Sequence, residues 1–238
     1  MNRIVMALLV ALGLAAGGWL AGYGVEKSRA PVRTVTVKGL AEQDVKADLA
    51  LWPIRFVRAG NDLAQVRDEI QRDDTAVTTF LQKNGLADAV SFRGMDVTDR
   101  NAQQYGDGNV PFRFIITRTI MLRTQDVAKI DEAYKQSSQL VDSGVILSNE
   151  GVGSGNPVYL YNGLTTLKPA MIAEATKNAR EAAQQFAHDS QSRLGRILVA
   201  DQGVFQILPR DNAPMLQEDQ QIDKTIRVVT TIKYQLVD

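Results

Sequence analysis

The chain has 238 residues, with 27 Lys and Arg residues balanced by 27 Asp and Glu residues, one histidine and no cysteine. Because the net charge is zero, no whole-chain field favours nucleic acid or anionic lipid as a partner. The lack of cysteine excludes disulfides and thiolate metal sites, and leaves nothing for an oxidising cell envelope to act on.

The N-terminal segment is the most distinctive part of the sequence. Residues 4–24 are uncharged and almost wholly apolar, and about 20 such residues let a helix cross a bilayer core of about 30 Å. Trp19 and Tyr23 lie near its far end, where amphipathic aromatic side chains favour the membrane interface. We therefore expect residues 1–30 to form a transmembrane anchor and linker, with the lipid bilayer as the partner of residues 4–24.

A cleaved signal peptide is the alternative. Its apolar core is ordinarily shorter, about 7–15 residues, but Leu14-Ala15-Ala16 offers small residues at which a peptidase can cut. Basic residues stand on both sides of the run, so charge counting leaves the orientation ambiguous. We favour a single-pass protein of the bacterial inner membrane, with its body in the periplasm. After cleavage it would be a soluble periplasmic protein.

The body, residues 31–238, is long enough for one large domain or two packed lobes. Alternating apolar residues predict strands, and apolar residues three and four apart predict helices. The predicted strands cover 32–39, 48–58, 90–100, 112–123, 196–207 and 223–237, and the predicted helices cover 61–83, 126–142 and 168–194. Polar loops are expected at 101–111 and 208–222, and a hairpin-like stretch at 145–161, around the glycine-rich segment 151–157.

Local signals set several of these boundaries. Asn61 or Asp62 caps the first soluble helix and Gly85 ends it in a left-handed conformation. Asp126 caps the second helix, and Pro169 suits the first turn of the long helix, which Gly195 ends. Pro53 lacks the N–H of a central strand, so it predicts a sheet edge or a bulge. Strand pairs that alternate with helices repeat one topology and predict an α+β fold with antiparallel sheet.

Small side chains dominate one face of the long helix. Residues of this kind let a helix lie close against a sheet or another helix, so we interpret the face as a packing surface. The predicted stripe consists of Ala175, Ala179, Ala182, Ala183, Phe186, Ala187 and Ser190.

Few residues are candidates for chemistry. His188, beside Asp189, is the only histidine, and metal ligation requires several converging groups. Asp73 and Asp74 interrupt the apolar stripe of the first soluble helix. Paired carboxylates can act as acid and base, but charged neighbours such as Arg72 favour a solvated helix face.

Other catalytic and binding patterns are missing from the sequence. The glycine-rich segment 151–156 lacks the lysine of a phosphate-binding loop, so we interpret it as a turn. A Ser-His-Asp triad would have to use His188, which no nucleophile-elbow sequence accompanies. Basic patches interleaved with aromatic residues, which bind nucleic acid, are absent as well. We therefore assign no catalytic, cofactor or metal residues and expect a protein that is not an enzyme.

Several segments, in their order along the chain, resemble the SIMPL-domain family of bacterial envelope proteins. The resemblance covers essentially all of residues 32–238. Its motifs are Val35–Gly39, Asn84–Leu86, the Ala-rich stretch Leu167–Arg180, Leu194–Ile197 and the alternating strand Ile226–Leu236.

This resemblance implies an α+β domain in a periplasmic or membrane-associated protein that assembles into a homo-oligomeric ring or channel-like particle. Some relatives are described as oxidative-stress defence proteins and others as periplasmic immunogenic proteins, and several have cleaved signals. A mammalian relative is described as a signalling adaptor, which favours protein contact over chemistry. The family has no established catalytic residues, so none is carried over to this chain.

Two classes of function therefore stay open. The first is a non-enzymatic, membrane-anchored oligomer, linked to envelope or oxidative stress, whose exposed sheet edges a partner subunit extends. The second is a small-ligand-binding protein or an unrecognised enzyme, with a site between lobes.

Overall fold

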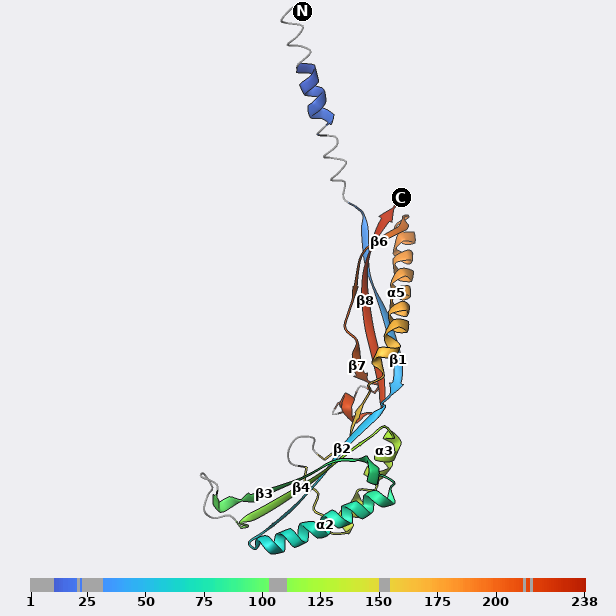
Figure 1. Cartoon of the computed structure of the whole chain (residues 1–238). Helices are drawn as coiled ribbons and strands as arrows, with labels where there is room; N and C mark the ends of the chain where they lie inside the picture. The colour runs from blue at the N-terminus through green and yellow to red at the C-terminus, as the bar shows by residue number, and fades with distance from the viewer. Residues whose placement is uncertain are drawn as a thin grey trace, which may run out of the picture. The chain divides into compact units, whose positions relative to one another are not determined.

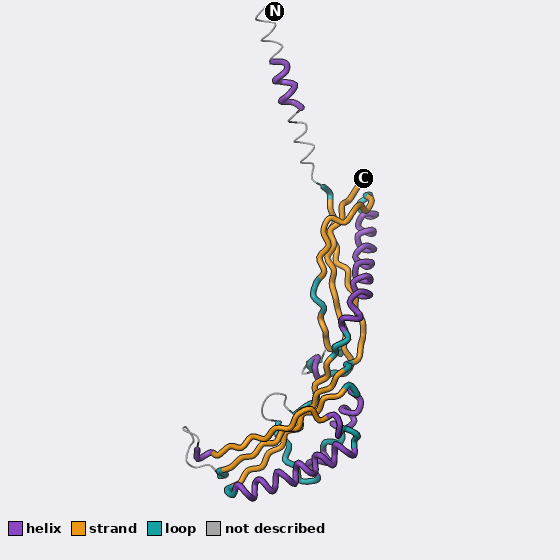
Figure 2. Tube along the Cα trace, in the orientation of Figure 1, coloured by secondary structure: helices purple, strands orange, loops and turns teal. Residues whose placement is uncertain are grey.

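The computed structural model describes residues 11–20, 22, 32–102, 111–149, 155–211, 213–214 and 216–238. The chain divides into two compact units. A terminal unit comprises Met1–Gly39, Ala175–Gly203 and Thr230–Asp238, and a central unit comprises Leu40–Glu174 and Val204–Val229. Each of them contains both strands and helices (Figure 2). The α+β prediction is confirmed, and so is antiparallel pairing of the strands.

The predicted membrane segment is only partly described. Residues 11–20 form a helix, drawn in blue near the N-terminus in Figure 1, and the rest of the predicted span 4–24, apart from Gly22, lies outside the described residues. Among the helices that the structure describes, none combines the length and hydropathy that a bilayer crossing requires.

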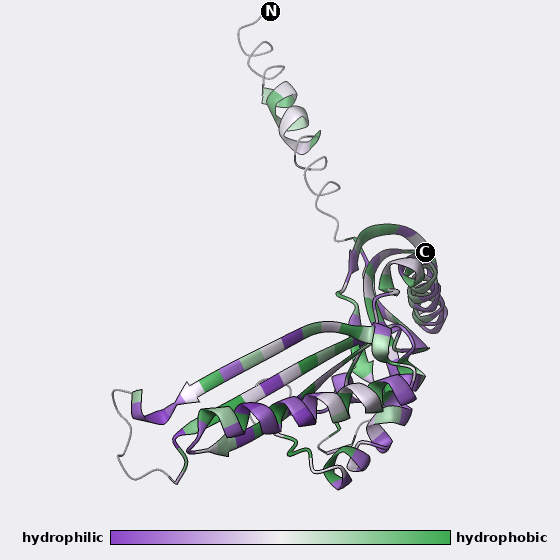
Figure 3. Ribbon diagram, turned by 60° about the horizontal axis from the view of Figure 1, so that its bottom comes forward, coloured by the Kyte–Doolittle hydropathy of each residue, from purple (hydrophilic) through white to green (hydrophobic). Residues whose placement is uncertain are grey.

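The central unit is built on a four-stranded sheet in the order β3-β4-β2-β5. Helix α2 runs along one face of its three long strands (Figure 3). The strands are β2 (Leu49–Gly60), β3 (Val90–Asp99), β4 (Phe114–Thr124) and β5 (Val158–Leu160), and the helices are α2 (Leu63–Lys83), α3 (Val127–Lys135) and α4 (Ser138–Asp142). Short 3₁₀ turns, η1 (Ala87–Ala89) and η2 (Arg100–Ala102), flank β3.

The core of the central unit follows from strand alternation. Every second residue of β2 is buried, including Trp52, Ile54 and Phe56, and these side chains join the buried face of α2 in one apolar cluster. The Trp52 ring packs edge-on against Phe80, at a centroid distance of 6.5 Å, and against Tyr134, at 5.7 Å. The period of two along the strand thus sets which face receives the helix.

The predicted caps of the helices are confirmed. Asp62 accepts hydrogen bonds from the backbone N–H groups of Ala64 at 2.8 Å and Gln65 at 3.1 Å, which starts α2. Gly85 has a φ of 65°, which ends it. Asp126 caps α3 through the N–H of Lys129. The single helix predicted for residues 126–142 is instead two, α3 and α4.

Pro53 lies at a local edge of β2, as predicted. The N–H of Val57 donates to Ile146 and the carbonyl of Arg55 accepts from Ser148, so the odd residues of β2 direct their backbone groups away from β4. Farther along the same edge, β5 pairs only with Leu49–Leu51. Pro53 falls between these two pairings, where a missing N–H removes no ladder hydrogen bond.

In the second sheet, β8 (Asp223–Val237) pairs with β1 (Thr34–Lys46), β6 (Arg193–Gln202) and β7 (Gln206–Pro209). Helix α5 (Leu164–Asp189) is the longest helix described. Within the terminal unit, its buried alanines pack against the apolar face of this sheet, which includes Val37, Ile232 and Tyr234.

The packing surface predicted on α5 is confirmed for its alanines, and wrong for Phe186 and Ser190. Ala175, Ala179, Ala183 and Ala187 are buried at intervals of four residues and Ala182 is half-buried, whereas Ser190 is exposed and Phe186 is more than half exposed. Phe186 precedes Ala187 by one residue, and one residue turns the side chain by about 100° around the helix. The aromatic ring therefore lies off the stripe.

Gly39 of β1 is required by the close approach of this helix. A Cβ atom at position 39 would lie 1.9 Å from the carbonyl oxygen of Ala175 and 2.5 Å from the backbone nitrogen of Ala179. Only glycine, which has no Cβ, fits at this distance. The small residues of helix and strand therefore form one matched contact.

Both predicted ends of α5 are wrong, and distant contacts explain the first. The helix begins at Leu164, not at residue 168, so Pro169 lies inside it. The Asp48 carboxylate accepts from the N–H groups of Asn162 and Gly163, which fixes the chain just before the helix.

The helix also ends earlier, at Asp189, not at residue 194. Gln191 adopts a φ of 54°, and the N–H of Ser192 donates to the carbonyl of Ala187 at 2.8 Å. This is a Schellman-type ending, in which glycine is the usual residue. Gly195, which the sequence suggests as the stop, lies in β6 instead.

Other errors concern strand partners. The predicted repeat of strand pairs is wrong, because β1 belongs to the sheet of β8 and β2 to the other sheet. The predicted hairpin at 145–161 is also wrong, because Leu147 bridges to Phe56 and β5 pairs with the start of β2. The predicted strand 196–207 is two strands, β6 and β7, and the loop 208–222 contains a 3₁₀ turn, η3 (Glu218–Gln220).

Candidate functional site

The two acidic residues that interrupt the stripe of α2 face the sheet. Asp73 is only 4% exposed. Its two carboxylate oxygens accept from Arg58 of β2, with Nε to Oδ2 at 2.6 Å and Nη2 to Oδ1 at 2.8 Å. Arg58 also donates to the carbonyl of Gly144. The hydrogen bonds that Arg58 donates to Asp73 raise the pKa of Arg58 above its ordinary value, which keeps the guanidinium charged.

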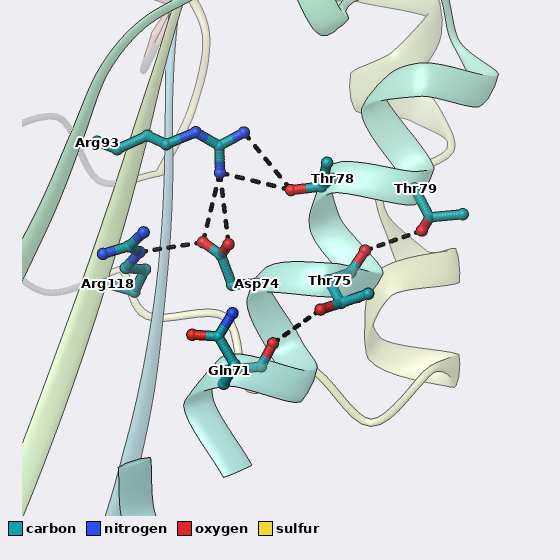
Figure 4. A network of polar contacts seen from close by, with 7 residues as sticks. All are labelled: Gln71, Asp74, Thr75, Thr78, Thr79, Arg93 and Arg118. Carbon is teal, nitrogen blue, oxygen red and sulfur yellow. Dashed lines mark hydrogen bonds and ion pairs between the residues drawn. The ribbon is translucent and has the colours of Figure 1, made fainter. Parts of the chain in front are cut away.

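Asp74 contacts the other two long strands (Figure 4). Its Oδ1 accepts from Nε of Arg118, in β4, at 3.0 Å, and from Nη1 of Arg93, in β3, at 3.4 Å. Arg93 also reaches the Thr78 hydroxyl, one turn farther along α2. Together Asp73, Asp74, Arg58, Arg93 and Arg118 form what we call the acid–arginine seam.

The expectation that Asp73 and Asp74 decorate a solvated helix face is therefore wrong. Their partners lie 15 to 44 residues away, beyond the range of local pattern reading. One signal was present in the sequence. Arg58 lies two residues after the buried Phe56, and Arg118 lies two residues after the buried Ile116. Because side chains two residues apart on a strand share a face, each guanidinium points to the side of the sheet that α2 covers. By contrast, Asp68 pairs with Arg67 on an exposed surface, as expected.

The seam holds α2 on the sheet. The bidentate Arg58–Asp73 pair fixes two planar groups relative to each other and joins α2 to β2. Single contacts of Asp74 with Arg118 and Arg93 join the same helix to β4 and β3. Each carboxylate is neutralised by a guanidinium, so this arrangement suits positioning better than acid–base chemistry. These contacts hold α2 against one face of β2, β3 and β4.

The outer strand of that sheet carries an exposed apolar edge. β3 ends the strand order, and Phe92, Met95 and Val97 are 59%, 54% and 51% exposed. Pairing with β4 places Met95 opposite Arg118 and Val97 opposite Ile116, on the side of α2. Sequence reasoning predicted this strand but not that it lies at the edge, because strand order is not readable from alternation alone.

A pocket of about 210 Å³ lies at the opposite side of β2 from β4. Trp52 and Tyr134 line it, and each is held by a hydrogen bond, from Trp52 Nε1 to the Gly155 carbonyl at 3.0 Å and from the Tyr134 hydroxyl to Asn156 Oδ1 at 2.7 Å. Of the glycine-rich segment predicted to be a turn, residues 151–154 lie outside the described residues.

Two other polar side chains, His188 and Tyr159, lie outside the seam. The His188 side chain is exposed, with its Nδ1 atom 3.4 Å from Oδ1 of Asp189. Within the described residues, no group of three His, Cys, Asp or Glu side chains is placed to hold a metal ion. Tyr159 is buried in the core, and burial, followed by the charge of Asp131, raises the pKa of its hydroxyl.

The sequence predicted an α+β chain with antiparallel sheet and a helix that packs through alanines, and the structure shows both, with the strands divided between two sheets. The SIMPL family model, described as a protein of unknown function (DUF541), matches residues 35–234. The chain therefore belongs to the SIMPL family. No curated protein is significantly similar to it.

Among the solved structures that match is the crystal structure of an uncharacterized conserved protein from Listeria innocua, at 10% sequence identity and a TM-score of 0.18. The match covers 85% of this chain and 95% of that chain.

Proposed function

We propose that this protein is a non-enzymatic, membrane-anchored envelope scaffold that assembles into a homo-oligomer, linked to envelope or oxidative stress. The observation that carries the proposal is the β3 edge, where three large apolar side chains are more than half exposed. The acid–arginine seam supports the same function, because it holds the sheet behind this edge in one arrangement. Exposed apolar surface on an ordered element is typical of protein–protein contact.

The anchor completes the proposal. Residues 4–24 remain long and apolar enough in sequence to serve as a tether, with the body in the periplasm. An assembly with several such tethers binds the membrane through all of them at once. Its affinity for the membrane is therefore higher than that of a single helix. A scaffold of this kind acts through its surface and needs no catalytic group.

The test uses the full chain extracted from membranes in detergent. Size-exclusion chromatography with light scattering gives the protein mass of the particle. We expect a multiple of the 26.1 kDa protomer. A monodisperse monomer at micromolar concentration would refute the oligomer, and recovery of the chain in the aqueous fraction without detergent would refute the anchor.

A small-ligand function is the second candidate, and the pocket beside Trp52 favours it. Aromatic surface together with fixed polar groups such as Asn156 is typical of ligand sites. Native mass spectrometry of the purified chain tests this function. A bound small molecule that is lost in Trp52→Phe would support it, and a particle of bare protein mass would count against it.

A further inference from the structure

Strand β3 is an edge without the usual protection. It is the outermost strand of its sheet and runs for ten residues, and no strand of the described chain pairs with its outer side. Edges of this length are ordinarily protected by proline, by charged side chains such as lysine, or by a central bulge. β3 contains no proline or lysine, and its one irregularity, between Val90 and Phe92, lies at the end of the strand. Two of its three charged side chains, Arg93 and Asp99, are paired within the chain with Asp74 and Arg113.

We propose that β3 pairs antiparallel with β3 of a second copy of this chain, around a two-fold axis at Met95, so that two sheets join into one. This inference rests on the homo-oligomer of the proposed function and names its contact. A two-fold axis perpendicular to the sheet leaves the same face of both copies on one side of the joined sheet. Each odd-numbered residue of β3 therefore lies opposite an odd-numbered residue of the second copy, and each even-numbered residue opposite an even-numbered one. Arg93, Met95, Val97 and Asp99 thus share one face of the joined sheet.

The charges on β3 select the register. Centring the axis on Arg93 places two guanidinium groups opposite each other, and centring it on Asp96 places two carboxylates opposite each other. Like charges directly opposite are destabilising. Centring it on Gly94 sets the apolar Phe92 against Asp96.

Centring on Met95 avoids all three conflicts. Met95 then meets its own copy, and Arg93 meets Val97. Arg93 and Asp99 keep the partners that they have within each copy, Asp74 at 3.4 Å and Arg113 at 2.9 Å, so neither charge has to be matched across the joined edge. Met95, the central exposed apolar residue of the edge, is thereby covered by its own copy, and no like charges lie opposite each other.

The chain has no cysteine. An introduced cysteine is therefore its only thiol, and a disulfide between two chains shows that this position of one copy lies beside the same position of the other. In the proposed pair, the two Cα atoms of residue 95 are about 4.5–5.5 Å apart, within the range of about 4.4–6.8 Å that a disulfide accepts. We expect Met95→Cys in the full chain, in native membranes with a mild oxidant, to form a covalent dimer. Val141→Cys is the matched control, because Val141 is 57% exposed on α4, away from β3.

Register is tested in the same membranes. Val97→Cys alone should crosslink poorly, whereas co-expressed Arg93→Cys and Val97→Cys chains should form a mixed dimer. In parallel, Met95→Lys places two ammonium groups together at the axis and should shift the detergent-extracted particle to a smaller mass. Val141→Lys should leave that mass unchanged.

The outcomes separate this inference from the function on which it rests. If light scattering gives an oligomer but Met95→Cys crosslinks no better than Val141→Cys, the β3 contact is wrong and the scaffold stands. A monomeric wild-type chain overturns both. If Met95→Cys forms a disulfide with a different protein and no homodimer, the occupant of the β3 edge is not a second copy of this chain, and the inference is wrong.

Discussion

Removing the Asp73 carboxylate tests the interpretation of the acid–arginine seam. In Asp73→Ala, the Arg58 guanidinium stays between α2 and the sheet but loses both hydrogen bonds to the carboxylate, at 2.6 and 2.8 Å. Breaking one side of a buried ion pair costs about 3–5 kcal/mol, because the other charge is left uncompensated. Since Arg58 is partly exposed and keeps its contact with Gly144, we expect the lower end of this range.

The assay is urea unfolding of the full chain in detergent, followed by tryptophan fluorescence. Trp52 belongs to the same core as α2, and the change Trp19→Phe in all variants makes Trp52 the only reporter. Asp68→Ala is the matched control on the same helix, since its pair with Arg67 is exposed and should contribute less than about 1 kcal/mol.

A double-mutant cycle gives the coupling of the pair. The double variant with Arg58→Ala should be destabilised by about 1–3 kcal/mol less than the sum of the single variants. If Asp73→Ala costs no more than Asp68→Ala, or if the two single effects simply add, the seam does not hold the helix to the sheet.

Three further predictions concern packing, titration and capping. Gly39→Ala should destabilise the terminal unit by about 1–3 kcal/mol or more, because its Cβ would meet the Ala175 carbonyl; thermal unfolding with the exposed Lys38→Ala as control tests this, and equal melting temperatures would contradict it. The raised pKa of Tyr159 keeps its hydroxyl neutral in the folded chain. The contribution of this group to the free energy of unfolding is therefore complete below pH 10 and falls at higher pH, by at most about 1.4 kcal/mol per pH unit. Alkaline unfolding curves of Tyr159→Phe should lack this component, and curves parallel to wild type would show that the residue does not titrate in this way. Asp62→Ala removes the cap of α2 and should cost about 0.5–2 kcal/mol in urea unfolding, so an unchanged midpoint would show that the cap does not matter.

Local signals predicted the parts of the fold that depend on neighbours in sequence. Asp62, Asp126 and Gly85 set the boundaries of α2 and α3 as expected, because a cap acts within one helical turn. The alanine stripe of α5 identified a packing face, because spacing of four residues defines one side of a helix.

The errors share a different cause, which is contact between distant residues. The start of α5 is set by Asp48, more than a hundred residues earlier. The end of α5 is the exception, because it is a local feature in which Gln191 adopts the left-handed conformation usual for glycine. Asp73 and Asp74 seemed solvated because their arginine partners lie on three separate strands. Strand order is equally non-local, so the alternation of β3 did not reveal that it forms an edge.

The measurement that tests the account most directly is native mass spectrometry of the full chain, released from membranes in detergent micelles. The anchored scaffold predicts a complex of several protomers, each with the intact mass of 26.1 kDa that includes residues 4–24. A single free protomer would contradict the oligomer, and protomers that lack the N-terminal segment would contradict the anchor.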